Sequence, residues 1–222
     1  IMAQAARSTQ LSTEPRHFAQ KTAIYGRCAC PFGRAETRVP LPLRAMFSYR
    51  HAFHAGNHAD VLKHTTLIAT LQHLTEKEVA LAVLDTHAGA GMYRLDGDYA
   101  NTSGESVDGI ARLEGVTDLC PALQAYMDMV RSFNNGSKIK AYPGSPFIAH
   151  SLLREQDKLK LFELHPTDMR SLAGNTAQLN AGRQIQVLCE DGFEGVKKFL
   201  PPVSRRALLF CDPSYEIKSD YA

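Results

Sequence analysis

Long hydrophobic runs are absent from this sequence. No apolar stretch approaches the ~20 residues needed to cross a bilayer, which argues against an integral membrane protein. The net charge is also small, because 25 Lys and Arg face 23 Asp and Glu, so a nucleic-acid partner is allowed but not demanded. Internal repeats and low-complexity tracts do not stand out. The 222 residues, 44% of them hydrophobic, are enough for one globular domain, with or without an appendage.

Cysteine is scarce and its number is odd, with residues at Cys28, Cys30, Cys120, Cys189 and Cys211. This distribution argues against a disulfide framework and suits a reducing cytoplasm, where we expect the protein to be located. The first two cysteines lack the spacing and the second pair that a structural zinc site requires. Cys189 and Cys211 lie in apolar runs, so we predict that they are small buried side chains.

The first 45 residues differ in composition from the rest. They contain six Arg and one Lys against two Glu, with interspersed Ser, Thr and Pro and little periodicity. An Arg-rich, acid-poor stretch is also typical of an organellar transit peptide. Because Met46 opens a much more structured stretch, we favour residues 1–45 as a mostly disordered leader of upstream or artefactual sequence.

After this leader, apolar runs alternate with helical stretches. Asn57 is a suitable N-cap for a helix that carries Leu67, Leu71 and Leu74 on one face. Strand–helix alternation with short connections predicts an α/β protein with a doubly wound sheet. The predicted strands are 79–85, 158–164, 184–190 and 206–212, and the predicted helices between them include one capped by Ser145 and two near 166–179 and 191–199.

Residues 92–142 are more polar and lack a strong strand pattern. They contain helical stretches near 105–114 and 121–133, which indicates a helical insertion.

Acidic residues stand at or near the end of every predicted strand. Ligands of open parallel sheets bind beyond the carboxyl ends of the strands, beside the topological switch point. We therefore expect these side chains to share one crevice. They are Asp85, Glu163, the pair Glu190 and Asp191, and Asp212.

Three of these positions allow both a functional and a purely structural interpretation. The small residues 88–91 after Asp85 let backbone pass close to a ligand, but they are not a GxGxxG fingerprint and also suit a tight strand exit. Glu163 could bind a ribose diol or be a solvated charge. Asp191 could bind the edge of an adenine ring or cap a helix, and the two roles are compatible.

The tetrapeptide Asp212-Pro213-Ser214-Tyr215 follows the last predicted strand. Pro213 contributes a carbonyl without an N–H group. The Asp212 carboxylate and this carbonyl could both accept hydrogen bonds from an exocyclic amino group, while Tyr215 offers a ring for a base removed from its stack. A simple turn is the alternative, and the other strand-end sites weigh against it.

Six segments occur in the order MFSYRHAFHAGNHADVLKH, DTHAGAG, YPGSP, FELHP, EDGF and DPSYE. They closely resemble the motifs of the bacterial family that methylates an adenine N6 of 23S ribosomal RNA. The resemblance runs from Met46 to the C-terminus and is highly specific, particularly in its histidine-rich opening. It implies a Rossmann-like fold that uses S-adenosylmethionine, with a methyltransferase domain over 46–222 and the helical insertion near 92–142. Ser214 departs from the pattern, because many relatives have a second proline there.

The resemblance also implies roles for individual residues. Asp212 would be catalytic, and Tyr49, Pro213 and Tyr215 would bind the substrate. The partner would be 23S ribosomal RNA, protein-free or in early assembly, and the enzyme a monomer. The implied cofactor contacts are Lys63, His64, His87, Ser145, Glu163, Asp191 and Gly192.

The histidines of residues 48–64 permit other interpretations. His51, His54 and His58 have a conceivable metal-binding spacing, but no Cys or carboxylate set accompanies them, so we predict no metal. Ordinary surface or core histidines are a second alternative. We favour an arrangement in which Tyr49 and the basic residues contact RNA while Lys63 and His64 face the cofactor.

Two rival functions remain, namely DNA adenine methylation and an inactive RNA-binding remnant. A methyltransferase sheet of this type usually has seven strands, but only four strand-like runs are visible here. We therefore expect an incomplete sheet and interpret the chain as a fragment of a longer product or a disrupted reading frame. The strand at 206–212 is then expected to expose an apolar edge.

Overall fold

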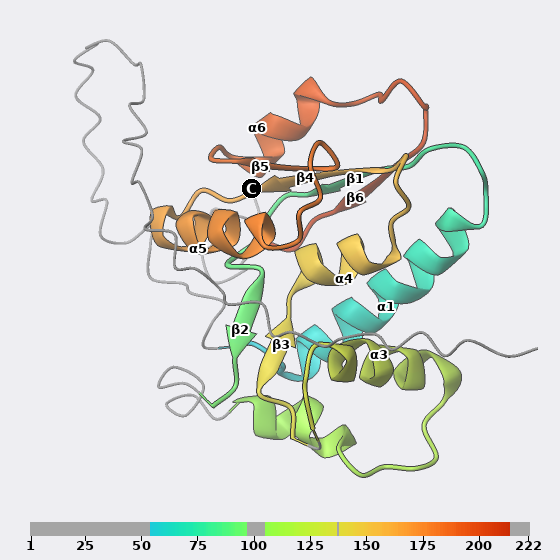
Figure 1. The fold of residues 1–222 in the computed structure, drawn as a ribbon, viewed down its shortest axis with the longest axis vertical. Helices are drawn as coiled ribbons and strands as arrows, with labels where there is room; N and C mark the ends of the chain where they lie inside the picture. The colour runs from blue at the N-terminus through green and yellow to red at the C-terminus, as the bar shows by residue number, and fades with distance from the viewer. Residues whose placement is uncertain (1–53, 97–104, 137, 214–222) are drawn as a thin grey trace, which may run out of the picture. The chain divides into compact units, whose positions relative to one another are not determined.

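The computed structural model describes residues 54–96, 105–136 and 138–213 (Figure 1). Its main sheet has four parallel strands in the order β5-β4-β1-β6. The strands are β1 (Ala82–Asp85), β4 (Lys158–Phe162), β5 (Ile185–Leu188) and β6 (Ala207–Phe210). This arrangement confirms the predicted α/β class, and each of the four strands lies within its predicted range.

The strand order creates a switch point beside β1. From β1 the chain moves to β4 and then outward to β5, before it returns to β6 on the other side of β1. In doubly wound sheets a ligand crevice opens at the carboxyl ends of the strands where the order reverses. The carboxyl ends of β1 and β6 are therefore the expected position of a site.

The helices begin close to their predicted starts. The side chain of Asn57 caps α1 by accepting the N–H of Asp60 at 3.0 Å, as predicted. The prediction that Ser145 caps α4 is wrong, because Gly144 is the N-cap and the Ser145 hydroxyl is bonded to Asp85 instead. The α-helices are α1 (His58–Thr75), α3 (Pro121–Ser132), α4 (Ser145–Leu152), α5 (Pro166–Ala177) and α6 (Gly192–Gly195), which the 3-10 turn η4 (Val196–Lys198) extends.

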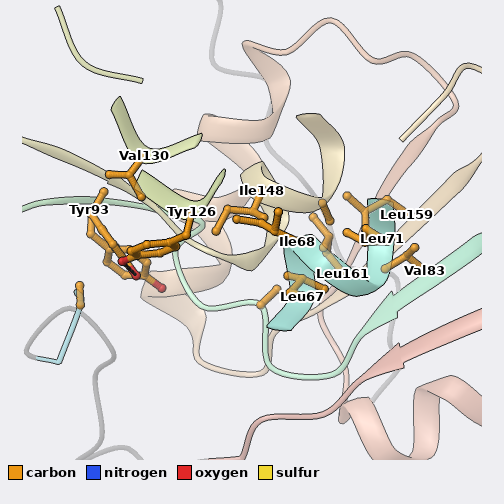
Figure 2. Packing of buried hydrophobic residues seen from close by; sticks show 14 of the residues in the cluster. Leu67, Ile68, Leu71, Val83, Tyr93, Tyr126, Val130, Ile148, Leu159 and Leu161 are labelled. Atoms are coloured by element: carbon orange, nitrogen blue, oxygen red, sulfur yellow. Dashed lines mark hydrogen bonds between the residues drawn. The ribbon is translucent and has the colours of Figure 1, made fainter. Parts of the chain in front are cut away.

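Apolar side chains are buried on both faces of the sheet. Helices α1 and α4 lie on one side of it and α6 on the other (Figure 1). On the α1 side, a cluster shown in Figure 2 joins β1 and β4 to these two helices and includes Leu67, Ile68, Leu71, Val83, Ile148, Leu159 and Leu161. On the opposite side, a smaller cluster contains Leu84, Phe162 and Val196, with Phe199 packed against it. The alternation of side chains along the strands produces these two faces.

The region between β1 and α4 differs from its predicted structure. Two short strands, β2 (Met92–Arg94) and β3 (Ala141–Pro143), pair in antiparallel fashion, and three residues each are too few for a clear alternation in sequence. The predicted helix at 105–114 is two 3-10 turns, η2 (Glu105–Asp108) and η3 (Ile110–Leu113). Gly109 separates them, and a Cβ there would lie 2.0 Å from the carbonyl oxygen of Gly56, so glycine permits the turns to pack against the start of α1.

Strand β6 is at the edge of the sheet, since no strand within the described ranges pairs with its outer side. Leu209 is 45% exposed there, in agreement with the predicted apolar edge. The prediction that Cys189 and Cys211 are buried is wrong, because they follow the edge strands β5 and β6 and are exposed. Within residues 54–96, 105–136 and 138–213, no helix is both long enough and apolar enough to cross a bilayer.

Candidate functional site

Three carboxylates meet at the carboxyl ends of the central strands. Asp85 is the last residue of β1, Glu163 follows β4 directly, and Asp212 lies two residues beyond β6. Burial is the main cause that raises the pKa of Asp85, and the negative charges of Asp212 and Glu163 raise it further. The structure therefore brings these three acids within electrostatic reach of one another.

Asp85 occupies the centre of this group and is buried. The Ser145 hydroxyl donates a hydrogen bond to Oδ2 at 2.6 Å, and the His87 backbone N–H donates to Oδ1 at 3.2 Å. Both bonds favour the carboxylate, but burial outweighs them and raises the pKa of Asp85 to about 7. This side chain is consequently set to change charge near neutral pH.

Helix α1 brings a cation to the carboxylates. Lys63 Nζ donates to Oδ2 of Asp212 at 2.5 Å and lies 2.8 Å from Oδ1 of Asp60. Asp60 is itself buried and accepts the N–H of Gly56 at 2.9 Å. Burial lowers the pKa of Lys63, but the two carboxylates more than offset this effect, so the pKa is raised overall. Lys63 thus remains a cation and holds the Asp212 carboxylate in place.

The turn formed by residues 86–91 lies beside Glu163. The Glu163 side chain accepts the N–H of Gly89 at 2.8 Å through Oε2 and the N–H of His165 at 2.7 Å through Oε1. Gly89 has a φ of +60°, a conformation that favours glycine. Each carboxylate oxygen has more than one acceptor direction, so Glu163 retains the capacity to accept bonds from a diol.

Helix α6 packs against the same turn through Gly192. A Cβ at Gly192 would lie 2.2 Å from the carbonyl oxygen of Thr86, so any side chain there would force the turn and the helix apart. Asp191 caps α6 by accepting a backbone N–H at 3.0 Å, while its side chain remains exposed. The rings of His87 and Phe193 meet edge to face, with centroids 5.3 Å apart.

His64 has different surroundings from Lys63. Its side chain is 2% exposed, and its Nδ1 lies 2.9 Å from the hydroxyl oxygen of Tyr142. Consecutive residues on an α-helix are about 100° apart around its axis, which explains why Lys63 and His64 contact different groups.

The remaining predicted site residues are only partly placed. Tyr49 and Tyr215 lie outside the described residues, whereas Pro213 is buried next to Asp212. Among the histidines of the opening segment, His54 Nδ1 lies 2.8 Å from Oε2 of Glu105. Over residues 54–96, 105–136 and 138–213, no group of three His, Cys, Asp or Glu side chains is arranged to hold a metal ion.

Sequence reasoning missed two residues of this region. Asp60 could have been found, because it lies three residues before Lys63 and so shares its face of the helix. Tyr142 belongs to the YPGSP segment, but no local pattern indicated its contact with His64, because this contact joins a strand to a helix 78 residues away.

The assembled site has a definite chemical character. One ammonium group stands among several carboxylates, beside a turn of small residues that leaves backbone accessible. An excess of negative charge suits a cationic ligand, and carboxylates suit ligand hydroxyl and amino groups. A buried carboxyl with a strongly raised pKa is also common at functional sites.

Known proteins that resemble this chain are ribosomal RNA methyltransferases. A family model described as ribosomal RNA large subunit methyltransferase D, RlmJ, matches residues 78–222. The chain is 49% identical over 176 residues to ribosomal RNA large subunit methyltransferase J of Escherichia coli K12. It is 46% identical over 177 residues to the protein of that name from Haemophilus influenzae. Each alignment covers 79% of this chain and 62% of the relative.

A solved structure also resembles this chain. The crystal structure of protein LPL1258 from Legionella pneumophila, described under the family DUF519, has a TM-score of 0.66 and 38% sequence identity. The match covers 76% of this chain and 61% of that one, so this chain spans a little over three fifths of its relatives. Because the family model matches more than half of the sequence, the chain belongs to the RlmJ family of ribosomal RNA large subunit methyltransferases.

Proposed function

We propose that this chain carries the catalytic part of an S-adenosylmethionine-dependent enzyme that methylates the N6 amino group of an adenine in 23S ribosomal RNA. The position of Asp212 and Pro213 carries the proposal. They follow β6 at the switch point, and Lys63 holds the Asp212 carboxylate among the other strand-end acids. Membership of a ribosomal RNA methyltransferase family supports the same reaction class.

The residues around the switch point fit S-adenosylmethionine. This cofactor has a positively charged sulfur and carries a ribose, an adenine and an amino-acid end. The excess of carboxylates over ammonium groups in the site would suit the positive charge of the sulfur. Its sulfonium supplies the methyl group for transfer. The residues that we propose as its contacts are Lys63, His64, His87, Ser145, Glu163, Asp191 and Gly192.

Asp212 is proposed to position the target amine. Lys63 occupies Oδ2 of its carboxylate, so Oδ1 is the oxygen that would accept one amine N–H, while the carbonyl of Pro213 accepts the other. These bonds direct the nitrogen lone pair toward the methyl group for in-line displacement, and positioning supplies most of the catalysis. The exocyclic nitrogen is not deprotonated beforehand, so the proton passes late, to Asp212.

The substrate side of the proposal depends on residues beyond the described ranges. Tyr215 would support the extruded adenine by stacking, and Tyr49 would contact the RNA. We propose that the target is 23S ribosomal RNA free of protein or in early assembly, and that a monomer acts on it in the cytoplasm. The curated relatives named as ribosomal RNA large subunit methyltransferases support this choice of substrate.

The test uses Asp212→Ala in this chain, with Asp118→Asn, an exposed acid, as the control. Calorimetry measures S-adenosylmethionine binding, and transfer of a labelled methyl group measures activity on ribosomal RNA fragments and on duplex DNA. We expect Asp212→Ala to bind cofactor but to lose transfer, and Asp118→Asn to match the unmodified chain. Full transfer by Asp212→Ala would refute the catalytic assignment. Transfer to DNA alone would favour a DNA methyltransferase, and absence of cofactor binding would favour an inactive RNA-binding fragment.

A further inference from the structure

The turn of residues 86–91, here called the glycine turn, is held by side chains from other elements. On β2, the hydroxyl oxygen of Tyr93 accepts the N–H of Ala90 at 3.1 Å. On α5, the side-chain amide of Asn175 donates to the carbonyl oxygen of the same Ala90 at 2.9 Å. Figure 1 shows α5 next to the segment that joins β1 to β2. Both backbone polar groups of this alanine are therefore bonded to side chains outside the turn.

Helix α5 meets the glycine turn at a second point. Leu172 is fully buried and lies three residues before Asn175, so the two side chains project from neighbouring positions on one face of the helix. A Cβ at Gly91 would lie 2.9 Å from Cδ1 of Leu172, so glycine there permits the close approach. The Gly91 carbonyl in turn accepts the N–H of Gly144 at 2.8 Å. The end of the turn is thus enclosed between α5 and the start of α4.

The properties of α5 itself do not account for an asparagine at position 175. Asparagine has a low helix propensity, and Gly174 beside it has a lower one. Part of the reason is that an asparagine side chain forms hydrogen bonds that compete with those of the helix backbone. The half-buried Asn175 side chain instead bonds a carbonyl 85 positions earlier in the chain. Its bond therefore serves the glycine turn and not the helix that carries it.

This bond fixes the orientation of the peptide group between Ala90 and Gly91. Gly91 has a φ of +77°, and glycine adopts positive and negative φ about equally well. Without a partner for the carbonyl, the peptide group could turn over at little steric cost to the glycine, which would exchange the directions of its C=O and N–H. One hydrogen bond favours the observed orientation by a factor of about five.

We propose that Asn175 is a positioning residue that holds the glycine turn in the form that binds S-adenosylmethionine. This inference rests on the proposed function, in which His87 of this turn contacts the cofactor. Two other proposed contacts meet the turn in the same form, because Glu163 accepts the N–H of Gly89 and Gly192 packs against the backbone of residue 86. The cofactor would bind the fraction of molecules with this form, so a smaller fraction weakens the apparent affinity in proportion.

The experiment compares Asn175→Asp with Gln178→Glu. Asn175→Asp keeps the shape of the side chain but removes the N–H donor. Gln178→Glu adds the same charge at an exposed position at the end of the same helix, where it serves as the control. An added negative charge by itself would attract the cationic cofactor, so it cannot explain weaker binding.

Three measurements follow each variant. Calorimetry measures S-adenosylmethionine binding, and urea unfolding measures stability. Nuclear magnetic resonance of the chain labelled with ¹³C at the alanine carbonyls and ¹⁵N at the glycines selects peptide groups in which alanine precedes glycine. Replacing Ala90 by Ser removes one of these signals and so identifies the carbonyl that Asn175 contacts.

Asn175→Asp should shift the Ala90 carbonyl signal and bind S-adenosylmethionine about three- to tenfold more weakly. Gln178→Glu should leave the signal in place and bind within about twofold of the unmodified chain. If Asn175→Asp does not fold, Asn175→Ala removes the donor without adding charge and is expected to give the same two results.

A purely structural role for Asn175 would lower stability in urea while the carbonyl signal and the cofactor affinity stayed unchanged, and this result would overturn the inference. Equal weakening of binding by Gln178→Glu would overturn it as well. Failure of the unmodified chain to bind S-adenosylmethionine would instead overturn the proposed function, while the carbonyl signal would still decide whether Asn175 holds the turn.

Discussion

Replacing Asp85 by Asn should make the protein progressively more stable, relative to the unmodified chain, as the pH rises from about 4 to about 7. The folded-state pKa of Asp85 is about 7, against an ordinary value of 3.8, and burial is the largest cause of the difference. Between these two values the folded protein binds one proton that the unfolded chain lacks, so the free energy of unfolding falls as the pH rises. At ~1.4 kcal/mol per unit, a window of roughly three units amounts to roughly 4 kcal/mol.

Asn preserves the shape of the side chain and removes the charge. Its carbonyl oxygen can still accept the His87 N–H, and its amide can donate to the Ser145 hydroxyl oxygen. The stability of Asp85→Asn relative to the unmodified chain should therefore grow by roughly 4 kcal/mol between about pH 4 and pH 8. Urea unfolding of both proteins at a series of pH values measures the difference, in which all shared titrations cancel. Parallel pH profiles would refute the reasoning.

Three further changes test other parts of the fold. Gly192→Ala would place a Cβ 2.2 Å from a backbone oxygen of the glycine turn and should lower the free energy of unfolding by about 1–3 kcal/mol. Gly174→Ala is the control, because a Cβ there would have no atom within 4 Å and should not destabilise α5. Urea unfolding checks both, and equal stabilities would contradict the predicted clash. Leu209→Lys on the outer edge strand should reduce aggregation of the chain at high concentration, measured by sedimentation, and unchanged aggregation would contradict the role of this apolar edge. Arg154→Met should lower the midpoints of thermal and urea unfolding, because the Asp157 carboxylate loses the guanidinium and keeps the backbone N–H groups of Arg154 and Leu81. Unchanged midpoints would show that the ion pair is not needed.

The main strands and the start of α1 could be predicted from the sequence because each depends on residues that are close together in the chain. Each main strand is a short apolar run, and Asn57 has the side chain that an N-cap requires, so these elements could be placed from their own residues. The meeting of Asp85, Glu163 and Asp212 followed from a general rule, because carboxyl ends of parallel strands share one edge of a sheet.

The remaining features depend on partners far away in the sequence. Ser145 is of a residue type that often caps helices, yet its hydroxyl donates to the Asp85 carboxylate 60 positions away. The sequence around Ser145 does not indicate this bond. The strands β2 and β3 are defined by their pairing with each other across the intervening turns and helix, not by their own three residues. The surroundings of His64 likewise depend on Tyr142, which only the folded chain brings close.

The ion pair between Lys63 and Asp212 joins two residues that a ribosome synthesises at well-separated times. The two residues are 149 positions apart, so at about 5–20 residues per second a ribosome would add Asp212 roughly 7–30 s after Lys63. During that interval Lys63 can already pair with Asp60, three residues before it, and β1 can already pair with β4. The cofactor side of the crevice can thus take shape while the chain is still being made. The carboxylate proposed to hold the target amine is added after these residues, so the cofactor side of the site can form before its catalytic group is available.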